Sequence, residues 1–317
     1  MTKIKFATFN CENLFRRFKF NSKLKKSEID DVVENGFIIE KSKFEIIDEP
    51  ERKFTAMAIN ETDADIICMQ EVENMDALKN FNSVHLKKAG YIYKMVIDGN
   101  DPRLIDVAVL SRYPFENVVT HQFQKDGNSF VFSRDNLEVN FNIKGTPLTI
   151  FVNHFKSMMG GRPKTKPRRV LQAKSVLDIL KNRFDNPDNH NWIIAGDLND
   201  YPQDSSSLDK LLKSNLMENV VERLAPEEQW THFWDGAPAY PKDSAFRQID
   251  YIFLSKKLAN KNKTAMPVVI RGGLSKKADK RMKKENASYP LWSRYTGIGD
   301  NRPHASDHCP IVIEIEL

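Results

Sequence analysis

Short clusters of carboxylates, amides and histidines end or interrupt six apolar runs of this chain. The clusters are TFNCEN (8–13), MQEVEN (69–74), NHFKS (153–157), AGDLND (195–200), RQIDYIF (247–253) and SDHCP (306–310). Carboxylate and amide oxygens are the ligands that a hard divalent cation such as Mg²⁺ or Mn²⁺ prefers, and the waters that such a cation keeps can be displaced by a substrate phosphate. Histidine can hold a proton near neutral pH. Together the clusters predict a metal-dependent site for phosphate chemistry.

Asp250 carries most of this argument because it lies inside the apolar run IDYIFLS. Any other single cluster could be a helix cap or a turn, where Asp and Asn are common. A buried carboxylate without a partner costs several kcal/mol, on the order of a lost charge partner. We therefore expect Asp250 to have a cationic or imidazole partner, and His308 is the natural candidate.

The elements that must position these clusters are strands alternating with helices. Strands are predicted at residues 3–9, 64–70, 105–111, 148–153, 191–196, 249–255 and 310–317. Helical periodicity is found at about 51–61, 74–89 and 166–183. This alternation predicts an α/β fold.

A single domain is predicted over residues 1–317. No break in composition and no Pro/Gly/Ser-rich linker divides the chain, and its first and last predicted strands both carry polar ends that would serve one site. Two stretches, 16–50 and 256–304, are interpreted as insertions because they are highly charged or rich in Lys, Gly and Asn.

The composition is that of a globular protein, with 40% hydrophobic and 29% charged residues, which excludes wholesale disorder. A net charge of +5 favours polyanionic partners. The basic residues cluster at 16–26, 162–169 and 276–284. Each basic run could face a phosphate or could be a solvated loop.

The spacing of the cysteines and the absence of a long apolar segment indicate where in the cell the protein is expected. Cys11, Cys68 and Cys309 are odd in number and lack CxxC spacing, so we expect buried free thiols and no zinc cluster or disulfide framework. No apolar segment is long enough for a signal sequence or a membrane span. We expect a cytoplasmic monomer without membrane insertion, although a processed secreted form would look the same.

Seven motifs in order resemble those of the endonuclease/exonuclease/phosphatase superfamily. They are TFNCENLF, DIICMQEVEN, IDVAVLSRYP, VNHFKS, IIAGDLNDYP, FRQIDYIFLS and SDHCPIVI, and the resemblance runs from residue 6 to 313. That superfamily includes deoxyribonuclease-type nucleases, abasic-site endonucleases, inositol polyphosphate phosphatases and neutral sphingomyelinases. The resemblance implies a four-layer sandwich of two mixed β-sheets flanked by helices, with the strand ends forming one metal-dependent site.

The resemblance also implies a role for each matching residue. The divalent metal, Mg²⁺ or Mn²⁺, would be held at Asn10 and Glu71, with Asp307 close by. Asp197 and Asn199 match the positions that orient and deprotonate the attacking water. His308 matches the histidine that contacts the scissile phosphate, and Asp250 matches the acid that orients it.

A second phosphate-facing histidine is expected at His154, as in nucleases of the deoxyribonuclease type. Asp106 is the candidate acid to support His154. Asn153 and Lys156 are expected to bind the same phosphate, and Arg112, in the motif IDVAVLSRYP, is expected to bind substrate.

Three functions compete. A nuclease acting on DNA or RNA is favoured by the basic runs and by the aromatic segment 231–253, whose rings could stack on bases or belong to the core. A lipid or small-molecule phosphodiesterase or phosphatase is the alternative; inositol phosphatases would be expected to carry Cys-Asp-Arg where this chain has Arg247-Gln-Ile-Asp250. An inactive binding module would lack one or more catalytic residues, and all of them are present.

Overall fold

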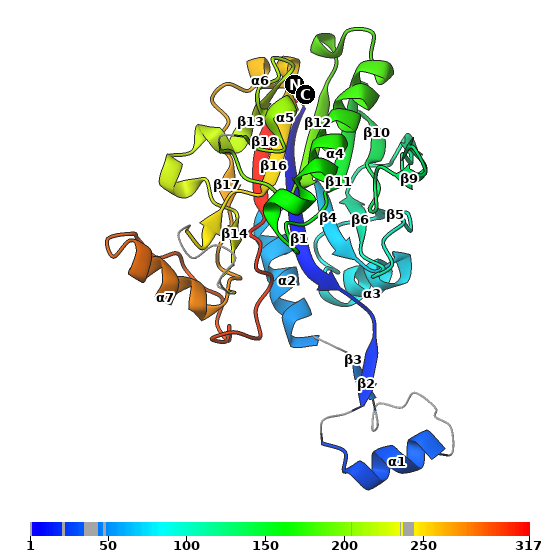
Figure 1. Ribbon diagram of the computed structural model, residues 1–317, viewed down its shortest axis with the longest axis vertical. Coiled ribbons are helices and arrows are strands. Elements are labelled where there is room, and N and C mark those ends of the chain that lie inside the picture. Colours follow the sequence, from blue (N-terminus) through cyan, green and yellow to red (C-terminus); the bar gives the residue numbers. More distant parts are fainter. Residues whose placement is uncertain are drawn as a thin grey trace.

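Two six-stranded mixed sheets lie face to face in the computed structural model, which describes residues 2–20, 23–34, 44–46, 49–203, 205–234, 236 and 244–317 (Figure 1). The first sheet has the order β17 (Val268–Val269), β18 (Ile311–Glu316), β1 (Lys3–Leu14), β4 (Ile66–Val72), β6 (Asp106–Ser111) and β5 (Tyr93–Val96). The second has the order β13 (Met217–Asn219), β16 (Asp250–Ser255), β12 (Trp192–Asp197), β11 (Thr146–His154), β10 (Leu137–Ile143) and β7 (Asn117–Val119). The first and last strands of the chain, β1 and β18, pair with each other.

Helices cover the outer face of each sheet. Helices α2 (Glu49–Thr62) and α3 (Met75–His85) pack against the first sheet. Helices α4 (Arg162–Arg183) and α5 (Asp209–Leu212) pack against the second. The predicted four-layer sandwich of two mixed sheets flanked by helices is therefore confirmed.

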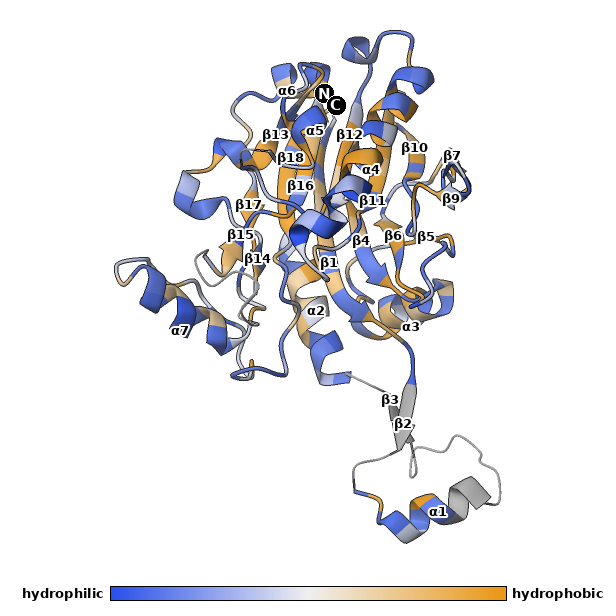
Figure 2. Cartoon of the chain, viewed as in Figure 1, coloured by the Kyte–Doolittle hydropathy of each residue, from blue (hydrophilic) through white to orange (hydrophobic). Residues whose placement is uncertain are grey.

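The core between the sheets follows from the alternation of side chains along each strand. Ile4 and Phe6 of β1 point inward to the side of the core where β12 and β16 lie, while Phe9 of β1 points outward to the helices. Figure 2 shows the strands as mainly hydrophobic and the outer surfaces of the helices as largely hydrophilic.

Smaller elements surround the sandwich. Helix α1 (Lys26–Glu34) and the pair β2 (Phe18–Phe20) and β3 (Phe44–Ile46) belong to the predicted insertion 16–50, the rest of which lies partly outside the described residues. The other strand pairs are β8 (Lys125–Asp126) with β9 (Ser129–Phe130), and β14 (His232–Phe233) with β15 (Phe246–Arg247). The remaining helices are α6 (Lys256–Lys261) and α7 (Lys276–Glu285), with the 3₁₀ turns Pro187–Asn189, Val220–Arg223 and Pro226–Glu228.

All seven predicted strands and all three predicted helices are present, with shifted ends. Helix α4 begins four residues before the predicted start of 166, since Pro163 falls in its first turn, where a missing backbone N–H is tolerated. The insertion at 256–304 contains α6, β17 and α7. The three cysteines are buried free thiols, as expected. In the described part of the chain no helix is long and apolar enough to cross a membrane.

Candidate active site

Four of the predicted site residues continue the inward-facing rows of the core strands. Side chains on one face of a strand recur every second residue. Asn10 therefore follows Phe6 on β1, His154 follows Val152 on β11, and Asp197 follows Ala195 on β12; Asp250 precedes Ile252 on β16. The hydrophobic rows thus carry the polar side chains to one end of the space between the sheets.

Glu71 reaches the site through an irregularity in β4. The register of β4 against β6 shifts between Met69 and Val72, and Glu71 has a backbone φ of 64°. A bulge of this kind re-aims a side chain, and a left-handed conformation outside glycine is typical of functional sites. Asn199 also has a positive φ, 53°.

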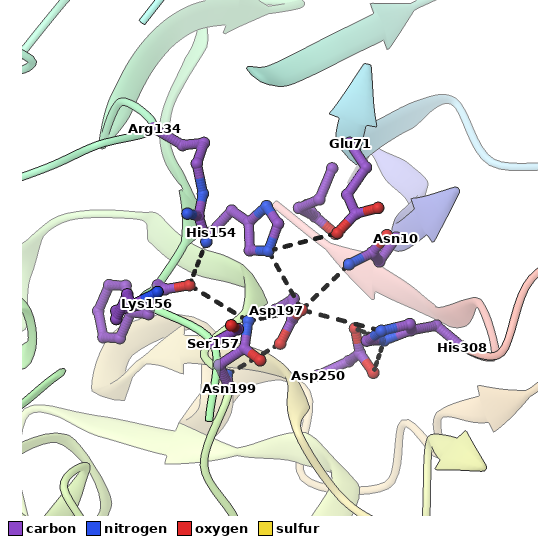
Figure 3. Close-up of polar contacts among 12 residues, drawn as sticks. Asn10, Glu71, Arg134, His154, Lys156, Ser157, Asp197, Asn199, Asp250 and His308 are labelled. Atoms are coloured by element: carbon purple, nitrogen blue, oxygen red, sulfur yellow. Dashed lines mark hydrogen bonds and ion pairs between the residues drawn. The ribbon is translucent and has the colours of Figure 1, made fainter. Parts of the chain in front are cut away.

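The carboxylate of Asp197 is the centre of the site (Figure 3). Its Oδ2 accepts hydrogen bonds from the side-chain amides of Asn10 (3.0 Å) and Asn199 (2.9 Å), and its Oδ1 accepts one from the Asn199 backbone N–H (2.8 Å). Nε2 of His154 lies 3.5 Å and Nε2 of His308 3.9 Å from the same Oδ2. Burial raises the pKa of Asp197 to about 7, with His308 acting in the other direction. A carboxyl group that titrates near neutrality is suited to act as a general base.

Glycine is required just before this carboxylate. Gly196 has a φ of 134°, and a Cβ atom there would lie 1.9 Å from the backbone oxygen of Asn153. Because only glycine permits this approach of β12 to β11, the Gly-Asp pair of the GDLND motif fixes both the strand spacing and the position of Asp197.

His308 and Asp250 form the predicted pair. Nδ1 of His308 lies 2.9 and 3.0 Å from the two carboxylate oxygens of Asp250, and the Asp250 carboxylate also accepts a hydrogen bond from Oγ1 of Thr231 (2.8 Å). Burial alone would lower the pKa of His308, but the charges of Asp250, Asp197 and Asp307 and the hydrogen bond to Asp250 hold it well above its usual value. His308 is therefore protonated near neutral pH.

His154 differs from His308 in that its imidazole is held uncharged. Burial and the nearby charges of Arg134 and His308 hold its pKa well below the usual value, so its imidazole is neutral. Its Nε2 lies 3.9 Å from Oε1 of Glu71. Its Nδ1 is buried without a hydrogen-bond partner among the residues that the structure describes. The site thus combines one charged and one uncharged histidine.

Arg134 is a functional residue that the sequence analysis missed. It is 1% exposed and forms an ion pair with Asp101 (Nη1 to Oδ2, 2.9 Å). Its Nη2 donates to the backbone oxygen of Phe155, which also accepts a hydrogen bond from Nδ2 of Asn199 (3.2 Å). Arg134 therefore helps to position Asn199. Its only signal in the sequence is a cation two residues after the buried Val131-Phe132 pair.

The charge distribution around Glu71 favours a divalent cation. Burial, with the nearby charges of Asp307 and Asp197, raises the pKa of Glu71 to about 7. Crowding of carboxylates at Glu71 is the electrostatic condition that a bound cation relieves. In the described part of the chain, two groups of His and Asp side chains also have donor atoms within 4.8 Å of one another, Asp197 with Asp250 and His308, and His232 with Asp307 and His308.

The predictions for Asp106 and Arg112 are wrong in this structure. Asp106 is buried, but its Oδ1 accepts a hydrogen bond from the Gly99 backbone N–H (2.9 Å), so it does not support His154. Arg112 follows the far end of β6, where it pairs with Asp63 and Asp65. Because β6 runs antiparallel to β4, only its start at Asp106 lies near the site.

Asn153 and Lys156, which were both expected to bind the phosphate, lie in different places relative to the site. Asn153 lies on the opposite face of β11 from His154 and donates to the Phe151 carbonyl (3.2 Å), so the predicted phosphate contact beside His154 is not formed by this geometry. Lys156 is half-buried at the margin of the site (Figure 3). Burial and the charges of Arg134 and Arg103 lower the pKa of Lys156.

The structure places the basic runs 162–169 and 276–284 and part of the aromatic segment 231–253. Helix α4 begins beside the GDLND loop, where Nε of Arg162 lies 2.7 Å from Oδ1 of Asp200. Helix α7 packs through Ala278 and Met282 on a cluster that includes Phe233 and Phe246, so these two rings are core. Trp234 is 47% exposed, and residues 235 and 237–243 of this segment lie outside the described residues.

Comparisons with known proteins identify a matching family and similar solved structures. Residues 6–317 match the family described as the endonuclease/exonuclease/phosphatase family. Similar solved structures include truncated Caenorhabditis elegans TDP2 (TM-score 0.60, 14% identity, 99% of this chain and 98% of that chain). They also include sphingomyelinase C from Streptomyces griseocarneus (0.59, 15%, 100% and 100%) and the mannosyl-6-phosphatase Bt3783 of Bacteroides thetaiotaomicron (0.57, 17%, 99% and 100%). At these identities the likeness shows the fold alone. No curated protein sequence matches the chain.

Proposed function

The chain belongs to the endonuclease/exonuclease/phosphatase family and is a hydrolase of phosphoester bonds, and from this premise we propose that it is a metal-dependent nuclease. It hydrolyses phosphodiester bonds of DNA or RNA by in-line attack of an activated water. A single observation carries the chemistry: the buried carboxylate of Asp197 lies between two histidines, with its Oδ2 3.5 Å from Nε2 of His154 and 3.9 Å from Nε2 of His308.

A divalent cation, Mg²⁺ or Mn²⁺, would be held by the carboxylates of Glu71 and Asp307 with the amide of Asn10. When bound, it would neutralise charge on the phosphate and polarise a phosphoryl oxygen. This donor set contains oxygens only, which suits a hard cation.

The chain's own residues divide the remaining work. Asp197, fixed by the two amides of Asn10 and Asn199, accepts a proton from the attacking water. His308 donates a hydrogen bond from Nε2 to an oxygen of the scissile phosphate, where negative charge develops. Asp250 binds Nδ1 and keeps the ring charged. Asn199, held in turn by the Phe155 carbonyl, fixes the position of Asp197 and of the water.

The substrate class is proposed from the charges around the site. The first turns of α4 carry Lys164 and Arg168 next to the GDLND loop. Helix α7 packs on the pair β14–β15, and His232 of β14 pairs with His308. Two basic helices therefore border the catalytic residues, and a polyanion longer than one phosphate could reach both.

Charge reversal on these helices tests the substrate. The suitable pairs are Lys164→Glu with Arg168→Glu on α4, and Lys277→Glu with Lys284→Glu on α7. Arg169 is unsuitable because it is fully buried and donates to the Lys156 and Arg162 carbonyls. Each pair should lower kcat/KM on long DNA and flatten its salt dependence, but leave hydrolysis of a small aryl phosphodiester nearly unchanged.

Lys144→Glu with Lys263→Glu is the matched control, since both lysines are exposed and lie near the other end of the sheets. This control should behave as the wild type on both substrates. If DNA cleavage were unchanged in the α4 and α7 variants and sphingomyelin were turned over rapidly, the protein would be a lipid phosphodiesterase and not a nuclease.

A further inference from the structure

His232 is a third histidine beside the catalytic pair, and the roles above do not use it. It lies on β14, forms a bridge with His308, and its ring centroid is 4.5 Å from that of His308. Building on the proposed function, we infer that His232, Asp307 and His308 form a zinc-binding site, which shares only Asp307 with the predicted magnesium ligands and at which Zn²⁺ switches the enzyme off by occupying Nε2 of His308.

The distances between the donor atoms fit a tetrahedral ion. Nε2 of His232 lies 3.6 Å from Oδ2 of Asp307, and Nε2 of His308 lies 3.8 Å from Oδ1 of the same carboxylate. The three donor atoms of this group lie within 4.8 Å of one another. Ligands about 2.0–2.1 Å from a tetrahedral Zn²⁺ are about 3.3–3.4 Å apart. The donor atoms would therefore have to approach one another by at most about 1.4 Å, the difference between 4.8 Å and the tetrahedral separation, to form the site.

The second ring nitrogen of His308 is already arranged as in a metal ligand. A metal-bound histidine usually donates its other ring N–H to a carboxylate, which fixes the orientation of the ring. Asp250 occupies this place at Nδ1 of His308. His232 is supported as well, because its ring is nearly parallel to that of Trp234, with an angle of 13° between the planes.

The two metal positions should differ in the ions that they select. Two imidazoles and one carboxylate suit Zn²⁺, whereas the oxygen set of Glu71, Asn10 and Asp307 suits Mg²⁺. The side chains of His232 and Asp307 are 12% and 26% exposed, so an ion from solvent can reach them. Zinc coordination would release the Nε2 proton of His308 to solvent, and His308 could then no longer donate to the phosphate.

Direct binding measurements test the site without any assay of activity. Zn²⁺ is titrated calorimetrically into the protein, and Co²⁺ is added in a parallel experiment to record the visible bands of a tetrahedral ion. His232→Phe keeps a ring against Trp234 but removes the ligand nitrogen, and should weaken Zn²⁺ binding by at least about tenfold. His190→Phe, the same exchange at an exposed histidine that stacks on Phe184 instead, should bind Zn²⁺ as the wild type does. Equal affinity in the wild type and His232→Phe, or no Co²⁺ bands in the wild type, would overturn the site.

Inhibition is measured separately, on a small aryl phosphodiester with saturating Mg²⁺. Zn²⁺ should inhibit the wild type and His190→Phe over the concentration range in which it binds, and His232→Phe should need at least about tenfold more Zn²⁺. Full activity at saturating Zn²⁺ would contradict the inhibitory role. A protein that binds Zn²⁺ through His232 but hydrolyses no phosphodiester with Mg²⁺ would instead refute the proposed function and leave the zinc site standing.

Discussion

Nδ1 of His308 lies 2.9 Å from Oδ2 of Asp250, a carboxylate buried at the start of a core strand. The two residues are 58 positions apart in the chain, and each supplies the partner that the other needs in a medium of low polarity. This pairing makes His308 a cation next to the proposed general base.

Asp250 and His308 should act as a unit in catalysis. Asp250→Asn and His308→Ala are each expected to lower kcat on the order of 10²- to 10³-fold. The double variant should lose little more than the worse single variant, because either change alone removes the oriented charge. Steady-state kinetics of the four proteins measures this, and losses that multiply would show that the residues act independently.

Glu71→Gln should weaken Mg²⁺ binding. The substitution removes a carboxylate from the predicted oxygen ligands and keeps the size of the side chain. Calorimetry should show a large loss of Mg²⁺ affinity together with the loss of activity. Glu116→Gln, at an exposed position outside the site, is the matched control. Unchanged Mg²⁺ affinity in Glu71→Gln would place the metal elsewhere.

Arg134 should matter for stability as well as for activity. Replacing it by Met leaves the Asp101 carboxylate, 5% exposed, with Arg103 as its remaining ion-pair partner, and the loss of the buried partner should cost about 1–3 kcal/mol. Urea unfolding measures the loss, and Arg168→Met, at a partly exposed arginine, should cost far less. If Arg134→Met lost less than about 1 kcal/mol, the arginine would not be fixing this part of the site.

Glu138, which lies away from the predicted metal position, should make the stability of the fold depend on pH. Burial alone would raise its pKa, but hydrogen bonds from His121, Asn140 and Arg183 and the charge of Arg183 lower it to about 2. Because the folded pKa lies below the unfolded one, the stabilisation is complete above about pH 5 and is lost as the pH falls toward 2.

Glu138→Gln should therefore cost about 1–2 kcal/mol at pH 7, allowing for solvent screening at the half-exposed Arg183. Urea unfolding between pH 7 and pH 4 should show the difference from the wild type beginning to narrow below about pH 5. A difference that grows as the pH falls would mean that the folded-state pKa is raised.

The sequence predicts the strands of this fold better than it predicts which way their side chains point. The strand at 249–255 and the helix at 166–183 can be predicted because their hydrophobic periodicity is a property of the local sequence. The prediction for Asn153 fails because its side chain lies on the other face of its strand, and that for Arg112 fails because it follows the far end of its strand. The face and the end that meet the site depend on which strands pair. Glu71 points into the site because of a bulge, and no local pattern indicates it.

Arg134 and His232 show a second limit. Both are brought to the site by segments without a strong strand or helix pattern, and their partners, Asp101 and Asp307, are 33 and 75 positions away. Asp250 and His308 were recognisable because a carboxylate inside an apolar run demands a partner, which is a physical constraint visible in the sequence itself.

The central claim is that Asp197 is the base of a metal-dependent phosphodiesterase. The most direct measurement is the hydrolysis of a small aryl phosphodiester and of plasmid DNA by the wild type and Asp197→Asn, each with Mg²⁺ and with EDTA. The wild type should cleave both substrates only with Mg²⁺, and Asp197→Asn should lose on the order of 10²- to 10⁴-fold in kcat on each. Wild-type rates in Asp197→Asn, or hydrolysis by the wild type that persists in EDTA, would contradict the account.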